Sequence, residues 1–245
     1  MAAAVIAVGA YIAANAGAIA MATIAIASAA YSYSMAKKAK GMANEDSTSE
    51  RTQIVRSSSL PENHIFGQRR SSGLLYFANE EAGEQDDGEW IHMAISHAGH
   101  NLNLVSGLLI NEEDPNSYAG YYEEEHFLNG LSVADDFLLS KCPDWKADMI
   151  GKGFAWCRVS LKFDQEKYPT GLPNLSWLKQ GYKVYDPRDG QTRYTENAPL
   201  CILHALREIW GWEDEFLIME TFADSANIAD EFVNTPDGSE RRYRM

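Results

Sequence analysis

The first 40 residues limit most strongly what this chain can fold into. Residues 2–33 carry no charged side chain and consist mainly of alanine, with isoleucine, valine and methionine between. As a helix, such a stretch is long enough to cross a bilayer. A helix that is apolar on all sides is stable only when it is buried. The sequence therefore predicts a long apolar helix over residues 1–40 that lies inside a protein assembly or a membrane.

Two interpretations of this helix stay open. Gly9, Ala13 and Gly17 recur at four-residue spacing, which puts small residues on one face and allows close helix packing. Alanine also contributes little to membrane insertion, which favours burial in an assembly. A lysine cluster at 37–40 follows the apolar run instead of preceding it, which argues against a secretory signal. The same lysines suit a single membrane span with a soluble domain, the alternative interpretation.

Net charge and cysteine spacing exclude several classes of function. The formal net charge of −14 opposes contact with phosphate backbones, so we expect no nucleic-acid partner, sequence-specific or not. Cys142, Cys157 and Cys201 are widely spaced and form no CxxC pair. Neither a disulfide framework nor a structural zinc site is indicated. We expect three buried thiols in a reducing cytoplasm.

The rest of the chain divides into a linker and a folded body. Residues 41–59 are polar and lack apolar periodicity, which predicts a linker. In the body, 60–245, short apolar runs alternate with glycine and proline, a pattern typical of antiparallel strands. Residues 111–150 are a possible insertion. Strands are predicted at 74–78, 91–97 and 154–163, with a solvated acidic loop at 80–89 and a turn-rich connection at 168–174.

The clearest strand, 154–163, has an alternating pattern. One face is predicted to be core, with Ala155, Cys157, Val159, Leu161 and Phe163. The other face is mixed, with Trp156, Arg158, Ser160 and Lys162. A hairpin is predicted over 182–194, because its centre reads Asp186-Pro187-Arg188-Asp189-Gly190. Proline presets φ near −65°, and glycine accepts a positive φ.

Helices are predicted in three places. Pro199 opens one, with Leu203, Leu206 and Trp210 on its buried face and Gly211 as its stop. A second spans 222–232, and the segment between them has no clear pattern. A third, at 131–139, would point Val133, Phe137 and Leu138 inward, after an exposed loop at 121–126. The expected fold class is α+β and β-rich: antiparallel strands and hairpins forming a barrel or sandwich, a long apolar N-terminal helix and two C-terminal helices.

Two groups of residues invite a catalytic or metal-binding interpretation. His92, His97 and His100 lie close in sequence, but His92 and His97 face opposite sides of a strand because their offset is odd. The run Glu123-Glu124-Glu125-His126 is typical of a solvated loop. The GxSxG, HExxH and P-loop motifs are absent from the sequence. We therefore predict no enzyme activity, no catalytic residue, no cofactor and no metal, with a hydrolase built on the histidines as the rival hypothesis.

Aromatic residues supply the interface candidates. Tryptophan is enriched at protein interfaces but more often fills cores. On this basis we expect about two of five tryptophans at interfaces: Trp145, Trp156, Trp177, Trp210 and Trp212. The selected interface or packing candidates are Gly9, Ala13, Gly17, Trp156, Trp177, Tyr185, Asp186, Pro187 and Gly190.

An ordered series of segments over about residues 51–245 resembles a known family. The series begins with Arg56-Ser57-Ser58-Ser59-Leu60-Pro61, Ile65-Phe66-Gly67-Gln68, Gly73-Leu74-Leu75-Tyr76-Phe77-Ala78 and Trp90-Ile91-His92-Met93-Ala94-Ile95. It continues with Gly151-Lys152-Gly153-Phe154-Ala155-Trp156, Gly171-Leu172-Pro173-Asn174-Leu175, Gly181-Tyr182-Lys183-Val184-Tyr185-Asp186-Pro187-Arg188-Asp189-Gly190 and Tyr194-Thr195-Glu196-Asn197. In this order they are similar to the N-terminal part of the central tail-tip or hub proteins of lambda-like siphophages, the host-specificity protein J family. Many members also have an alanine-rich apolar N-terminus.

The resemblance implies a structural role in a virion. A family member of this kind is a homotrimeric hub at the tail tip, made in the host cytoplasm, that closes the tail tube and connects the distal tail ring to the tip or fibre. It implies a role in host attachment or genome ejection. The implied partners are copies of itself, the distal tail protein, the tape-measure protein, other tail-tip proteins and, through residues 2–33, a host membrane. Members continue well beyond residue 245, where they place receptor binding, so we expect that activity to lie outside this sequence.

Overall fold

The computed structural model describes residues 63–80, 90–236 and 238–245. The predicted apolar helix with Gly9, Ala13 and Gly17, the linker at 41–59 and most of the acidic loop at 80–89 lie outside these residues. Within the described ranges, no helix is long and apolar enough to cross a membrane.

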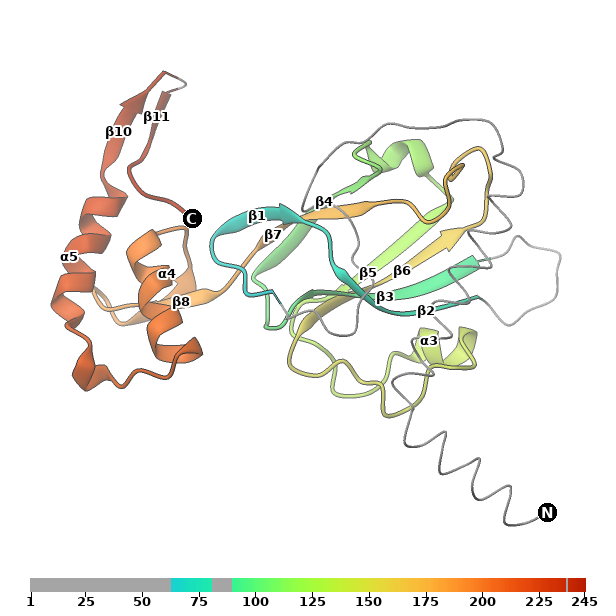
Figure 1. The fold of residues 1–245 in the computed structure, drawn as a ribbon, viewed down its shortest axis with the longest axis horizontal. Coiled ribbons are helices and arrows are strands. Elements are labelled where there is room, and N and C mark those ends of the chain that lie inside the picture. The colour runs from blue at the N-terminus through green and yellow to red at the C-terminus, as the bar shows by residue number, and fades with distance from the viewer. Residues whose placement is uncertain (1–62, 81–89, 237) are drawn as a thin grey trace, which may run out of the picture.

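Two antiparallel sheets form the larger of two lobes (Figure 1). The four-stranded sheet has the order β2-β3-β6-β5, with β2 Leu74–Glu80, β3 Trp90–Ala98, β6 Ala155–Lys162 and β5 Tyr122–Phe127. The three-stranded sheet has the order β1-β7-β4, with β1 Gln68–Ser71, β7 Leu175–Gln180 and β4 Leu104–Ile110. A short 3-10 helix, η1 (Pro115–Tyr118), follows β4. The strand predictions at 74–78, 91–97 and 154–163 are confirmed.

The main core lies between the two sheets. It contains Met93, Ile95 and Val159 from the larger sheet and Leu175 and Trp177 from the smaller one. Apolar side chains from both sheets thus share one buried cluster, as in a β-sandwich. The turn-rich connection predicted at 168–174 joins β6 to β7, and Tyr168 within it is fully buried. Of the predicted barrel and sandwich, the sheet order corresponds to the sandwich.

A second core covers the other face of the four-stranded sheet. Helix α3 (Asp136–Lys141) and its flanking loops pack there around Trp145 and Trp156. The prediction that only one face of β6 is core was wrong, because both faces are buried and Trp156 is 0% exposed. The predicted core residue Phe163 lies beyond the end of β6 and is 36% exposed.

The prediction for 121–139 was wrong in two respects. Most of the segment at 121–126 belongs to β5, which pairs with β6 and, among the described residues, lies at the edge of its sheet. An edge strand with glutamates on its outer surface resists unwanted pairing, and this composition hides the strand signal. The helix begins only at Asp136, because the carboxylate of Asp135 accepts from Leu138 N at 2.8 Å and caps it. Val133 therefore precedes the helix and is exposed, not inward.

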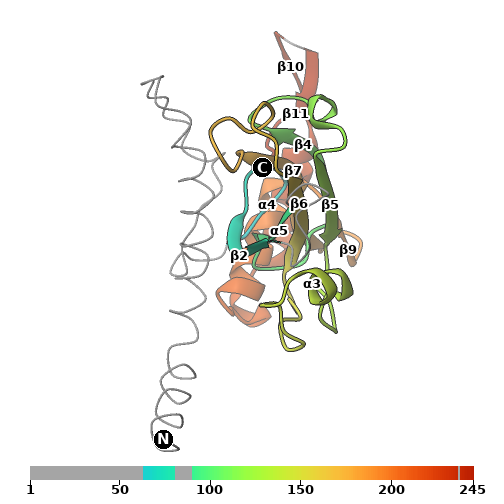
Figure 2. The ribbon, with the colours of Figure 1, turned by 90° about the vertical axis from the view of Figure 1, so that its right-hand side faces the viewer.

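The smaller lobe contains the C-terminal quarter of the chain (Figure 1, Figure 2). Its elements are β8 Lys183–Asp186, β9 Gln191–Tyr194, α4 Ala198–His204, the π-helical turn η2 Ala205–Ile209, the 3-10 turn η3 Asp214–Phe216, α5 Met219–Asp230, β10 Phe232–Thr235 and β11 Gly238–Arg241. The hairpin prediction is confirmed, with Val184 opposite Arg193 and Gly190 at φ +73°. Both predicted C-terminal helices are present, so the body is α+β and β-rich, with antiparallel strands.

The first C-terminal helix changes its winding before it ends. Asn197 caps its N-terminus by accepting from Leu200 N, with Pro199 in the first turn. Leu203 is buried as predicted, but Trp210 is 67% exposed, so its prediction as an inward residue was wrong. The π-helical turn η2 inserts extra backbone and rotates the residues after it away from the buried face. The helix stops at Gly211, whose φ is +69°.

Asp186 holds the hairpin and α5 together. Its side chain is 1% exposed and accepts from Arg188 Nε at 2.9 Å and from Arg193 Nη2 at 2.6 Å. Arg188 also contacts Asp230 of α5 at 2.9 Å. The hydrogen bond from the Arg188 side chain is the main cause that lowers the pKa of Asp186 below 3.8.

We expect Asp186→Asn to lower the free energy of unfolding by about 1–3 kcal/mol, because it removes buried charge-assisted hydrogen bonds. Urea denaturation at pH 7 measures the change. Asp189→Asn is the matched control, since Asp189 pairs with Arg193 in the same turn but is 46% exposed. The control variant is expected to lose less free energy of unfolding than Asp186→Asn. Because the folded pKa of Asp186 is lowered, its contribution disappears as the pH falls below 3.8. Equal losses in the two variants would contradict this account.

Candidate interaction surface and buried histidine cluster

Four large apolar side chains are exposed within nine residues of the smaller lobe. We call residues 210–218 the apolar loop, which joins η2 to α5 and includes η3. Trp210 is 67%, Trp212 50%, Phe216 68% and Ile218 71% exposed. Further exposed apolar side chains of this lobe include Ile202, Ile228 and Phe232.

The apolar loop is held in place by polar contacts and one buried side chain. Arg207 Nε lies 2.8 Å from Asp214 Oδ1, and Trp212 N donates to Leu206 O at 2.9 Å. Leu217 is 8% exposed and anchors the loop, while its neighbours Phe216 and Ile218 face solvent. Exposed apolar groups that are held in this way are typical of protein interaction sites.

The five tryptophans considered as interface candidates separate into two groups. Trp145, Trp156 and Trp177 are 3%, 0% and 0% exposed and fill the two cores of the larger lobe. Trp210 and Trp212 are the exposed pair. Of the two candidates selected from the sequence, Trp156 and Trp177 therefore pack internally, whereas the exposed tryptophans were not selected.

The hairpin candidates lie together in the smaller lobe. Asp186 is buried at the end of β8, and Pro187 and Gly190 belong to the turn between β8 and β9. Tyr185 is partly buried, and its ring lies 5.1 Å from the Arg207 guanidinium carbon, in cation–π contact. This contact connects the hairpin to η2 just before the apolar loop.

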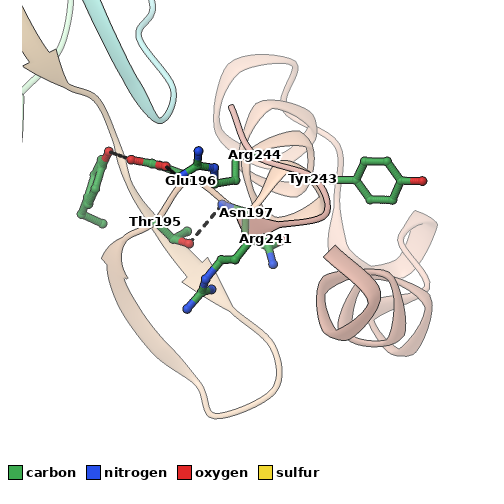
Figure 3. A pocket seen from close by; sticks show the side chains of 7 residues that line it. Thr195, Glu196, Asn197, Arg241, Tyr243 and Arg244 are labelled. Atoms are coloured by element: carbon green, nitrogen blue, oxygen red, sulfur yellow. Dashed lines mark hydrogen bonds and ion pairs between the residues drawn. The ribbon is translucent and has the colours of Figure 1, made fainter. Parts of the chain in front are cut away.

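A small pocket of about 250 Å³ lies between β9, α4 and the C-terminal residues (Figure 3). Its lining includes Arg241 and Arg244, which an anionic ligand would need. Both are already paired: Arg244 with Glu196 at 3.6 Å and Glu240 at 3.2 Å, and Arg241 with Asp230. Tyr243 points away from the other labelled side chains. The pocket therefore offers no free charge for ligand binding.

The histidines singled out in the sequence lie in three environments. As predicted, His92 and His97 face opposite sides of β3. His92 Nδ1 is 2.8 Å from Ser160 Oγ and its ring contacts Phe137 in the second core. His97 faces the main core.

His100 belongs to an aromatic junction between the lobes. It stacks on Tyr182 with ring centroids 3.5 Å apart, and His64 Nδ1 lies 2.7 Å from the Tyr182 hydroxyl. Ile65 N donates to His100 Nε2 at 2.9 Å, which requires that nitrogen to be unprotonated. Burial lowers the pKa of His100 to about 4, which agrees with a neutral structural ring.

His97, His126 and Cys157 form a cluster on three neighbouring strands. His126 of β5 is directly opposite Cys157 of β6, which in turn is opposite Ile95 of β3. A bulge in β3 between Ser96 and Ala98 gives His97 no partner on β6. One ligand atom from each member of the cluster lies within 4.8 Å of the other two.

Polar contacts continue from this cluster toward solvent. His97 Nε2 is 3.0 Å from His126 Nδ1, and His126 Nε2 is 3.3 Å from Glu124 Oε2. Trp177 Nε1 donates to the same glutamate oxygen at 2.7 Å. Facing a carboxylate, His126 Nε2 must donate, so in the neutral ring Nδ1 accepts from His97 Nε2. His97 Nδ1 is then a buried acceptor with no hydrogen-bond partner in the described structure.

A buried lysine lies beside the cluster. Lys179 is 0% exposed, and its amine donates to Ser72 O at 2.6 Å and to His97 O at 3.3 Å. Burial lowers the pKa of Lys179 to about 7. Burial also raises the pKa of the Cys157 thiol and lowers the pKa of His97. The Cys157 thiol and the His97 ring are therefore neutral near neutral pH, and the Lys179 amine loses its charge near pH 7.

Sequence reasoning weighed His97 and His126 in separate motifs and did not connect Cys157 to either. The register of β5 against β6 would have connected them, because it makes His126 and Cys157 a cross-strand pair. It was missed because 121–126 was predicted as a loop. All three cysteines are buried thiols, as predicted.

No protein-family model and no curated protein matches this sequence. Among solved structures, a chain from the virion of a native gene transfer agent particle matches with a TM-score of 0.40 and 10% identity. The match covers 60% of this chain and 32% of that chain, so this chain spans about a third of the neighbour's length. At this identity and TM-score, neither a shared fold nor a shared function follows from the match.

Proposed function

We propose that this chain is a structural component of a phage-type virion, located at the tail tip, and not an enzyme. In this proposal it forms a homotrimeric hub that closes the tail tube, binds the distal tail ring and the tape-measure protein, and takes part in host attachment or genome ejection. The ordered motifs from residue 56 to residue 197 support this placement, because the series resembles tail-tip hub proteins in both content and order.

The observation that carries the proposal is the apolar loop. A monomer that acts alone in water gains nothing from holding Trp210, Trp212, Phe216 and Ile218 in solvent. Large aromatic side chains commonly supply much of the binding energy at protein interfaces. The acidic residues 213–215 beside them are exposed as well and would form a polar rim. The occupant of this surface is a second copy of the chain or a neighbouring tail-ring protein.

The chain should be detected in purified particles from the organism that encodes it, at about three copies per particle if the hub is a trimer. Quantitative mass spectrometry gives the copy number, and antibody labelling in electron micrographs gives the position. Absence from purified particles, or recovery only from a membrane fraction, would overturn the proposal.

A paired substitution tests the surface itself. Trp210→Ser with Trp212→Ser should lower incorporation into particles by about tenfold or more, the effect of losing interface anchors. Thermal unfolding of the purified variant should stay close to wild type, since both side chains are at least half exposed. Val133→Ser is the matched control, an exposed apolar residue in the other lobe. Normal incorporation of the double variant would exclude the apolar loop as the assembly surface.

A further inference from the structure

We propose that His97, His126 and Cys157 bind a transition-metal ion, with Zn²⁺ as the expected occupant. The three side chains come from β3, β5 and β6, which are adjacent in one sheet, and their candidate ligand atoms lie within 4.8 Å of one another. An ion there would add a direct link among three strands that are paired by their backbone ladders. This inference is independent of the proposed function.

The chemistry of the ligands selects the class of ion. Two imidazoles and one thiolate form a borderline to soft set, which suits zinc and related transition metals. Calcium and magnesium prefer oxygen ligands and are not expected. Three protein ligands leave a fourth position, which water can fill.

The surroundings of His126 match those of a metal-bound histidine. Such a histidine usually donates its second ring N–H to a carboxylate, which fixes the orientation of the ring. His126 has this arrangement, with Nε2 at 3.3 Å from Glu124 Oε2. Glu124 is itself held by the indole N–H of Trp177 at 2.7 Å. Glu124 and Trp177 thus already hold the His126 ring in the orientation that a metal ligand needs.

The buried end of the cluster brings two ring nitrogens together. His97 is 1% exposed, and its Nε2 lies 3.0 Å from His126 Nδ1. An ion bound by both rings would replace this contact and lie beside the Cys157 thiol. Lys179 does not compete as a ligand, because its amine is engaged by Ser72 O and His97 O. A bound cation would also stabilise the Cys157 thiolate, which burial otherwise opposes.

The test uses the full-length chain, purified under reducing conditions and stripped with a chelator. Titration with zinc chloride, followed by calorimetry and elemental analysis, should give about one zinc ion per chain. Cobalt substitution should give a thiolate-to-cobalt charge-transfer band. Zinc should also raise the melting temperature, since an ion that binds only the folded state stabilises it. No zinc uptake by the wild-type chain would overturn the proposal.

Variants separate coordination from folding. His126→Asn and Cys157→Ala should abolish the zinc-dependent rise in melting temperature, and Cys157→Ala should also remove the charge-transfer band. His126 is partly exposed, so its variant is expected to fold even if Cys157→Ala does not. Glu124→Gln should weaken zinc binding by about 10- to 100-fold, the usual effect of losing an orienting carboxylate.

Cys142→Ala is the matched control, because Cys142 is also a buried thiol but lies in the second core. It should bind zinc like the wild-type chain. Zinc binding that persists in both His126→Asn and Glu124→Gln would show that the ion binds elsewhere and would refute the site.

Discussion

Trp156→Ala is expected to lower the free energy of unfolding by about 3–5 kcal/mol, the usual range for removing a large buried aromatic residue. Trp156 is 0% exposed and lies at the centre of the second core. Its ring lies 4.4 Å from that of Phe127 and 6.0 Å from that of Trp145, centroid to centroid. Removing it leaves a cavity that the β6 backbone and these rings cannot close. Urea denaturation measured by circular dichroism gives the change.

The matched control is the same substitution at an exposed position. Trp212→Ala removes an equal side chain that is 50% exposed and is expected to change stability by about 0.5 kcal/mol or less. Trp156→Phe should lose less than Trp156→Ala, because it keeps an aromatic ring and removes an indole N–H that has no partner in the described structure. Similar losses for Trp156→Ala and Trp212→Ala would contradict the assignment of a second core.

The second large effect is a pH dependence caused by Lys179. Burial lowers its folded-state pKa to about 7, from an ordinary value of 10.5. Between these values the unfolded chain binds more protons than the folded chain, so stability rises with pH. The rise is at most about 1.4 kcal/mol per pH unit for one group. Below pH 7 the lysine is charged in both states, and its burial is most unfavourable there.

Lys179→Met removes the titrating group with a side chain of similar shape. The free energy of unfolding of the wild type minus that of the variant should increase steadily from pH 7 to pH 9. Burial raises the pKa of Cys157 above its ordinary value of 9.0, which works in the opposite direction, but this effect begins only near pH 9, at the upper end of the range. His97, whose pKa is lowered, titrates below this window.

Lys183→Met serves as the control, because Lys183 lies on β8, the next strand along the chain, and is exposed. Its difference from the wild type should be flat over the same pH range. A flat difference for Lys179→Met would mean that the amine is not desolvated in the folded protein.

The sequence correctly predicted the elements whose conformation depends on a few neighbouring residues. The alternation in 154–163 predicted β6, and Pro187 with Gly190 predicted the hairpin turn, because strand alternation and turn dihedrals are properties of a few neighbouring residues. The odd offset of His92 and His97 correctly placed them on opposite faces, since side-chain direction in a strand depends only on position. The helices near Pro199 and residue 222 were predicted for the same reason.

The sequence failed where a residue's environment depends on distant segments. Trp156 is buried only because α3 and its flanking loops cover the side of β6 on which it lies. Trp210 was predicted inward from helical periodicity, but the π-helical turn before it moved it to the surface. The edge strand β5 has no alternating pattern, because its outer surface faces water and tolerates glutamate.

The same reason explains the histidine cluster. By itself the sequence determined the charge balance, three of the strands, the hairpin and the absence of a contiguous metal motif, because each of these depends on adjacent residues. Only the tertiary structure decided that His97, His126 and Cys157 meet, since their contact depends on the register of three strands and on one bulge. The exposure of the apolar loop was decided in the same way, by how the smaller lobe packs around Leu217 and leaves its neighbours in solvent.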